Sequence, residues 1–202
     1  MKYVEGFFRH FKDFPILTTR DAQMYLQHLG STQEYAKLFI KNLLKKGKLN
    51  KLKRGFYTFG TDPTLASLAF TPSYHGLQEA LSLHNLWEQE TNTILVTPRK
   101  VRPGVRQMLG GTVIIHRIAR KMFFGFETRN YYGQWINVSD VEKTLIDFVY
   151  FNQPLDSATL KEMKKRIDKK KLASYLEKCP DRIKRKIGKL FRQTYTPQGV
   201  RP

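Results

Sequence analysis

The segment from Ser31 to Lys46 has a regular alternation of apolar and polar positions. Its apolar residues recur at steps of three and four: Ala36, Phe39, Ile40, Leu43 and Leu44. Such a stripe predicts an amphipathic helix with one face in a core. Ser31 and Glu34 have the spacing of an N-terminal capping box, and Gly47 stands where a left-handed C-terminal cap is expected.

Three lysines lie off this apolar stripe. Lys37, Lys41 and Lys45 step by four residues and therefore project together from the predicted helix. Like charges at this spacing mildly destabilise an isolated helix, and a phosphate partner would remove that cost. The alternative is an ordinary solvated helix face, because charge patterning alone mostly reports exposure. The neighbouring elements of the chain decide between the two.

A second helix is predicted immediately before this one. Thr18 and Asp21 have capping-box spacing. An apolar stripe follows them: Ala22, Tyr25, Leu26 and Leu29. Gly30 then supplies a tight turn into the lysine-bearing helix. An earlier helix is predicted over Tyr3 to Phe11, ended by Pro15.

A short basic hairpin is predicted after the lysine-bearing helix. Leu49–Leu52 and Phe56–Phe59 form its strands around the turn Lys53-Arg54-Gly55. Helix, glycine turn, helix and basic hairpin is the order of a winged helix-turn-helix, which places one helix in a DNA groove and a loop beside it. We therefore predict a winged helix-turn-helix DNA-binding domain in residues 1–60.

This prediction assigns DNA contacts to two sets of residues. The helix supplies the contacts at or near the groove: Thr32, Gln33, Tyr35, Lys37 and Lys41. The hairpin supplies contacts to backbone phosphate or the minor groove: Lys51, Lys53 and Arg54. Most of these contacts would position the protein on the duplex rather than specify a sequence.

A new pattern begins after Gly60-Thr-Asp-Pro63, and we predict a second, α+β domain over residues 61–202. A helix is expected from Pro72 to Leu83. Four strands are expected after it: Thr93–Thr97, Thr112–Ile118, Phe123–Thr128 and Trp135–Val138. The capping-box spacing of Ser139 and Glu142 opens a further helix.

The C-terminal part of the chain, about residues 152–192, is helical and strongly basic by pattern. We expect two amphipathic helices broken near Cys179-Pro180, each packed by one face and cationic on the other. The cationic face would bind a partner protein or DNA flanking the main site through five residues: Lys164, Lys165, Lys169, Arg185 and Lys186. The last ten residues are expected to be frayed.

Composition narrows the partner classes. The formal net charge is +19 and the isoelectric point is about 10.1, which predicts affinity for nucleic acid, an acidic protein or an anionic membrane. The membrane is the weakest of these, because no apolar run approaches the roughly 20 residues of a spanning helix. Cys179 is the only cysteine. Together with an N-terminus lacking a signal-peptide pattern, this favours a cytoplasmic protein.

The sequence offers little catalytic chemistry. The histidines do not pair at metal-binding spacing, and no glycine-rich phosphate loop or nucleophile elbow is present. Asp140, Glu142 and Asp147 lie on one predicted helix and suggest a metal-dependent nuclease as an alternative. Asp140 and Glu142 fit better as first-turn carboxylates, whereas Asp147 on an apolar face needs a partner. We expect no enzyme activity, metal or cofactor.

Three consecutive segments carry a family resemblance: Ser73–Leu86, Thr93–Thr97 and Trp135–Asp147. With the N-terminal segment that ends Lys53-Arg54-Gly55-Phe-Tyr57, they resemble the AbiEi family of antitoxins and predicted regulators of viral defence systems. The resemblance covers about Leu17 to Tyr150. Its most specific pieces are Ala-Leu-Ser-Leu-His and Glu-Lys-Thr-Leu-Ile-Asp, which end at His84 and Asp147.

The resemblance implies an antitoxin of a type IV toxin–antitoxin system. In that family the winged helix binds inverted repeats in its own promoter and represses it, and the C-terminal domain counters a nucleotidyltransferase-like toxin. Alternatives are an orphan winged-helix transcriptional regulator, or a general nucleic-acid-binding protein that uses the basic C-terminal helices. A metal-dependent nuclease is the third alternative.

Overall fold

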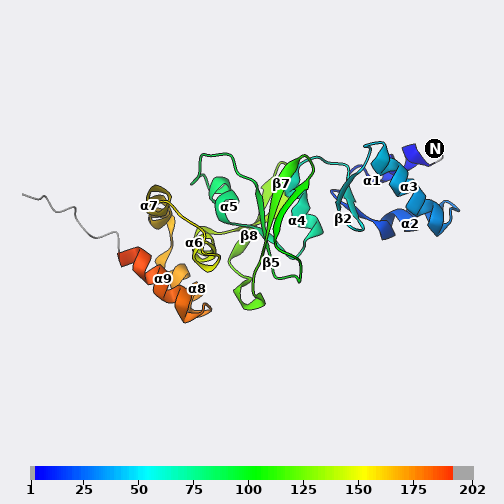
Figure 1. The fold of residues 1–202 in the computed structure, drawn as a ribbon. Coiled ribbons are helices and arrows are strands. Elements are labelled where there is room, and N and C mark those ends of the chain that lie inside the picture. The colour runs from blue at the N-terminus through cyan, green and yellow to red at the C-terminus, as the bar shows by residue number, and fades with distance from the viewer. Residues whose placement is uncertain (1–2, 193–202) are drawn as a thin grey trace, which may run out of the picture.

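The chain folds as a mixed α+β protein, as its sequence predicts, and the computed structural model describes residues 3–192 (Figure 1). The predicted frayed end, from residue 193 onward, lies outside the described residues. α1–α3 lie at one end of the molecule, a larger sheet lies in the middle, and the C-terminal helices lie at the other end.

The N-terminal unit combines helices with a small sheet. Its elements follow in order: α1 (Val4–Phe11), β1 (Leu17–Thr18), α2 (Thr19–His28), α3 (Gln33–Lys45), β2 (Asn50–Lys53) and β3 (Phe56–Thr58). β3 lies between β1 and β2 and is antiparallel to both. Their core centres on Phe7 and Phe39, whose rings are 5.0 Å apart. Gly30 (φ 81°) and Gly47 (φ 64°) adopt the left-handed conformation that the turn and the helix end require.

Side-chain caps fix where α2 and α3 begin. The carboxylate of Asp21 accepts a hydrogen bond from the N–H of Thr18 at 2.7 Å, and the Thr18 hydroxyl accepts one from the N–H of Asp21 at 3.2 Å. This is the predicted capping box. At α3 the prediction is wrong by one residue. Thr32, not Ser31, is the N-cap, and it accepts a hydrogen bond from the N–H of Tyr35 at 3.2 Å.

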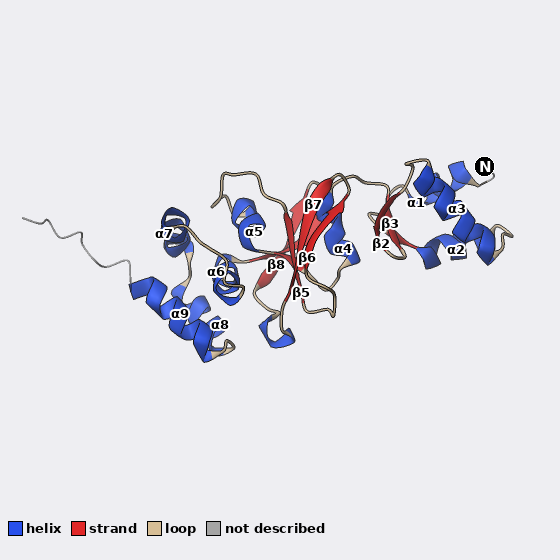
Figure 2. Ribbon diagram, viewed as in Figure 1, coloured by secondary structure: helices blue, strands red, loops and turns tan. Residues whose placement is uncertain are grey.

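A mixed sheet forms the centre of the second unit (Figure 2). Its strands follow in sequence order: β4 (Tyr74–His75), β5 (Thr93–Thr97), β6 (Gly104–Met108), β7 (Gly111–Arg117), β8 (Phe126–Tyr131) and β9 (Gln134–Ser139). In space the described strands lie in the order β6-β7-β5-β4-β9-β8. The pairs β5–β7 and β4–β9 are parallel, and the other neighbours are antiparallel.

Helices cover both faces of this sheet (Figures 1 and 2). One face carries the short turn η1 (Pro63–Leu65) and α4 (Ala66–Ala69). The other carries α5 (Leu77–Leu83) and α6 (Val141–Tyr150). The basic C-terminal helices then pack on α6: α7 (Ser157–Arg166), α8 (Lys169–Glu177) and α9 (Asp181–Arg192).

Three sequence expectations are corrected in this unit. Tyr74 and His75 form a strand, so the expected helix begins only at Leu77. The C-terminal segment has a second break before Asp168, which caps α8 by accepting hydrogen bonds from the N–H groups of Lys170 and Lys171, so it forms α7, α8 and α9 instead of two helices. The edge strand β6 was not expected.

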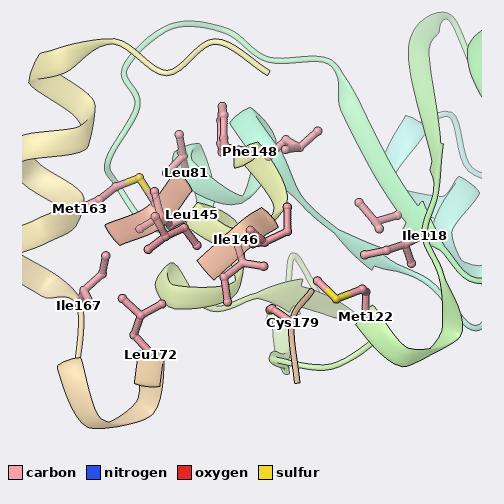
Figure 3. Close-up of a cluster of buried hydrophobic side chains, with 14 of the residues drawn as sticks. Leu81, Ile118, Met122, Leu145, Ile146, Phe148, Met163, Ile167, Leu172 and Cys179 are labelled. Atoms are coloured by element: carbon pink, nitrogen blue, oxygen red, sulfur yellow. The ribbon is translucent and has the colours of Figure 1, made fainter. Parts of the chain in front are cut away.

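α6 lies at the centre of the larger core. Figure 3 shows Leu145 and Phe148 of α6 among side chains from the C-terminal helices, including Met163 of α7 and Leu172 of α8. Ile183 of α9 belongs to the same buried cluster. The C-terminal helices are therefore part of this core.

A separate cluster joins the two units. Leu52 of β2 is buried against Ala69, Phe70 and strands of the larger sheet, with Phe56 of β3 partly buried beside them. In Figure 1, β2 and α4 face each other where the units meet. The hairpin β2–β3 thus packs against the second unit.

Candidate nucleic-acid interface

α3 buries one face and exposes the other, in the register that its sequence predicts. The buried side chains are Ala36, Phe39, Ile40 and Leu43. The lysine stripe, defined as Lys37, Lys41 and Lys45, is exposed. Among the described residues, no carboxylate lies within ion-pair distance of these three ammonium groups. The stripe is therefore an open row of positive charge.

The remaining DNA contacts predicted for α3 lie near its N-terminal end, and their side chains differ in exposure. Gln33 is exposed. Thr32 is exposed too, but its hydroxyl oxygen already caps the helix, so only the hydroxyl proton remains for another group. Tyr35 is half-buried, and its ring packs edge-on against Tyr3 with centroids 6.0 Å apart. Tyr35 thus contributes to packing, and its DNA contact stays a prediction.

The hairpin residues also lie in different surroundings. Lys51 and Arg54 are exposed. Lys53 is half-buried and points to the second unit, where its ammonium donates a hydrogen bond to the carbonyl of Ala69. Burial lowers the pKa of Lys53, and the positive charges of two arginines lower it further. This placement weighs against the DNA contact predicted for Lys53.

Two apolar side chains of α2 and α3 are exposed, and the sequence pattern did not predict a role for them. Leu38 of α3 is 52% exposed and Met24 of α2 is 60% exposed. Both lie off the apolar stripes of their helices, which is the signal that could have found them. An exposed leucine next to a row of lysines suits contact with a thymine methyl group in the major groove.

Some of the basic side chains predicted as C-terminal contacts are bonded to other residues of the protein, and others are exposed. Lys164 donates a hydrogen bond to the carbonyl of Leu190 at 2.5 Å, and burial lowers its pKa. Lys186 contacts the side chain of Asn152 at 3.0 Å, and Lys165 pairs with Glu162 at 2.6 Å. Two remain exposed and form no ion pair with any described residue, one on α8 and one on α9: Lys169 and Arg185.

Asp147 finds the partner that its position demands. Its carboxylate is fully buried, forms an ion pair with Lys143, and accepts a hydrogen bond from the hydroxyl of Tyr74 at 2.8 Å. Burial raises the pKa of Asp147, and the neighbouring Lys143 opposes that shift. The group is closed inside the core, where no substrate reaches it.

The other two carboxylates of α6 are also occupied by structural contacts. Asp140 caps α6 by accepting a hydrogen bond from the N–H of Lys143 at 2.8 Å, and it accepts another from Tyr175 at 2.8 Å. Glu142 accepts a hydrogen bond from the N–H of Asp168 at 2.7 Å. The capping box expected from Ser139 is therefore wrong by one residue. These contacts join α6 to α8.

The described residues contain no group of three or more histidine, cysteine, aspartate and glutamate side chains that could hold a metal ion. His75 and His84 are both buried. The Nδ1 atom of His75 lies 2.9 Å from the carboxylate of Glu79, and Nε2 of His84 lies 2.7 Å from the carbonyl of Ser139. Both rings are therefore packed within the protein.

No protein-family model and no curated protein matches this sequence. No helix formed by residues 3–192 is long and apolar enough to cross a membrane.

Proposed function

We propose that this protein is a DNA-binding transcriptional repressor whose N-terminal unit, residues 1–60, acts as a winged helix-turn-helix. α3 is the groove-binding helix in this proposal, and α2 supports it across the Gly30 turn. The observation that carries the proposal is the lysine stripe on α3, which is exposed and lacks an internal counter-ion among the described residues. Phosphates of a duplex supply the missing negative charge.

The nuclease alternative loses its support. Its three carboxylates are held by internal donors, and Asp147 is fully buried. A general nucleic-acid-binding protein that uses only the C-terminal helices would leave the open row on α3 without a role. Sequence-specific duplex binding accounts for that row and for the apolar side chain of Leu38 within it.

The test is duplex binding by a stripe variant and a charge-matched control. Lys37→Ala/Lys41→Ala should weaken binding to a labelled duplex of the gene's own upstream region by about tenfold or more. The slope of log K against log salt should fall by about two, because two phosphate contacts are lost. Fluorescence anisotropy across a salt series measures both quantities.

The control is Lys161→Ala/Lys170→Ala, which removes the same charge from exposed positions on the C-terminal helices, at the opposite end of the molecule (Figure 1). It should bind like wild type. If the control loses affinity and the stripe variant does not, duplex binding belongs to the C-terminal helices and the proposal for α3 is wrong.

We further propose, from the resemblance to AbiEi antitoxins, that the protein represses its own promoter at inverted repeats and counters a nucleotidyltransferase-like toxin. The exposed cations of α8 and α9, Lys169 and Arg185, support a docking face for an acidic surface. A nucleotidyltransferase-like reading frame next to the gene would supply that partner. Without one, the protein acts as an orphan regulator.

A further inference from the structure

Basic side chains also gather where the β2–β3 hairpin meets the second unit. The loop between β5 and β6 carries Arg99, Lys100 and Arg102, and Arg106 follows in β6. From residue 91 to residue 126 the chain has no acidic residue. The loop therefore brings positive charge to the junction without bringing counter-ions of its own.

An apolar side chain ties this loop to the cluster between the two units. Val101 is partly buried in the cluster that contains Leu52 of β2 and Phe56 of β3. Its two neighbours in the chain, Lys100 and Arg102, are exposed. Val101 therefore ties the loop to the cluster at the junction of the two units, with an exposed positive charge on either side of it.

Cations converge on the end of α4 at the same place. The ammonium of Lys53 lies 5.1 Å from the centroid of the Phe70 ring, and the guanidinium of Arg106 lies 5.3 Å from it. Arg99 donates a hydrogen bond to the carbonyl of Thr71 at 2.6 Å. Carbonyl groups at the helix end and an aromatic face can hold positive charges together in this way.

These charges are not neutralised within the described residues. No carboxylate lies within ion-pair distance of Lys53, Arg99 or Arg106. The lowered pKa of Lys53 reflects burial first and then repulsion by Arg99 and Arg106. An external anion at this place would relieve the repulsion.

We propose that this junction surface, defined as Lys51, Arg54, Arg99, Lys100 and Arg102, binds the phosphate backbone of the same duplex that α3 engages. The inference rests on the proposed function and adds a contact from the second unit. Duplex DNA is favoured over an acidic protein because Lys53 of the hairpin and Arg106 of β6 contact the same Phe70 ring, which places these cations beside the DNA-binding unit. Lys53 holds the hairpin against the end of α4 through Ala69, a positioning role.

The test is Lys100→Ala/Arg102→Ala, because both side chains are exposed. The probe is the labelled upstream duplex, with a hydroxyl-radical footprint of its sugar–phosphate backbone. The variant should bind about three- to tenfold more weakly at low salt, with a salt slope lower by about two. Protection should disappear at the flank of the site and persist at its centre. Lys161→Ala/Lys170→Ala, which removes the same charge, should keep both affinity and footprint.

Affinity and a footprint equal to those of the control would overturn the inference, even if Lys37→Ala/Lys41→Ala abolishes binding. The effect of Lys37→Ala/Lys41→Ala on duplex binding is a separate measurement, and it tests the proposed function. If Lys100→Ala/Arg102→Ala loses affinity only for a single-stranded RNA of the same sequence, the surface belongs to RNA and the inference is equally wrong.

Discussion

At the scale of single residues, two sets of charged side chains differ in whether they have a partner of opposite charge. Lys143 and Asp147 are both fully buried and form an ion pair, with the Tyr74 hydroxyl as a further donor to the carboxylate. The lysines of α3 have no such partner among the described residues. A buried pair serves the fold, whereas an unpaired exposed row can serve a partner.

The buried pair leads to a stability prediction. Asp147→Ala or Lys143→Met should each lower the free energy of unfolding by about 3–5 kcal/mol, because the partner is left charged and buried. The triple variant Lys143→Met/Asp147→Leu/Tyr74→Phe should recover most of this loss, since no polar group is stranded. Urea denaturation measures all three.

The exposed pair Lys165 and Glu162 is the matched control. Glu162→Ala should change stability by no more than about 0.5 kcal/mol, because surface ion pairs contribute little. If Asp147→Ala proves as mild as Glu162→Ala, the pair does not have the structural role assigned to it here.

At the scale of elements, helix starts are set by the residue whose side chain reaches the third backbone N–H. At α3 this is Thr32, although Ser31 has the better sequence signature. Thr32→Ala should cost about 1 kcal/mol of stability. Ser31→Ala should cost less than about 0.5 kcal/mol. Thermal unfolding of the two variants, side by side, decides which residue caps the helix, and equal losses would contradict the assignment.

Periodicity predicts the long elements because burial itself imposes it. The stripe on α3 and the strand Thr93–Thr97 lie where the sequence places them, and Thr93–Thr97 is buried throughout. β6 could not be predicted in this way, because as an edge strand it is at most half-buried and is defined by pairing with β7. Tyr74 and His75 were predicted to be helical. They form a strand instead, because they pair with residues distant in sequence, Val96 and Val138 among them.

For the same reason, only part of the candidate site could be predicted from the sequence. The exposure of Lys37 and Lys41 follows from helical spacing alone. The placement of Lys53 does not, because its carbonyl partner, Ala69, belongs to the second unit and no local pattern reports it. Tertiary contacts also tie Lys164 to Leu190, and only the fold shows this.

At the scale of the whole molecule, the two cationic ends are separated by the central sheet (Figure 1). The C-terminal helices cannot be removed to test their role, because Met163, Leu172 and Ile183 are buried in the core around α6. Truncation after Phe151 should therefore unfold the second unit, which would confuse loss of docking with loss of structure. A test of the C-terminal face needs surface variants.

Lys169→Glu/Arg185→Glu provides that test. Both side chains are exposed, so the core keeps its packing, while the reversed charges repel an acidic partner. In cells expressing a co-encoded toxin, this variant should fail to restore growth, yet it should bind the upstream duplex like wild type. Arg9→Glu/Lys12→Glu reverses two exposed charges at the other end of the molecule, one on α1 and one at its C-cap, and should still neutralise the toxin. Growth restored by both variants would contradict the docking face, and loss of duplex binding by the first would show that α8 and α9 contact DNA instead.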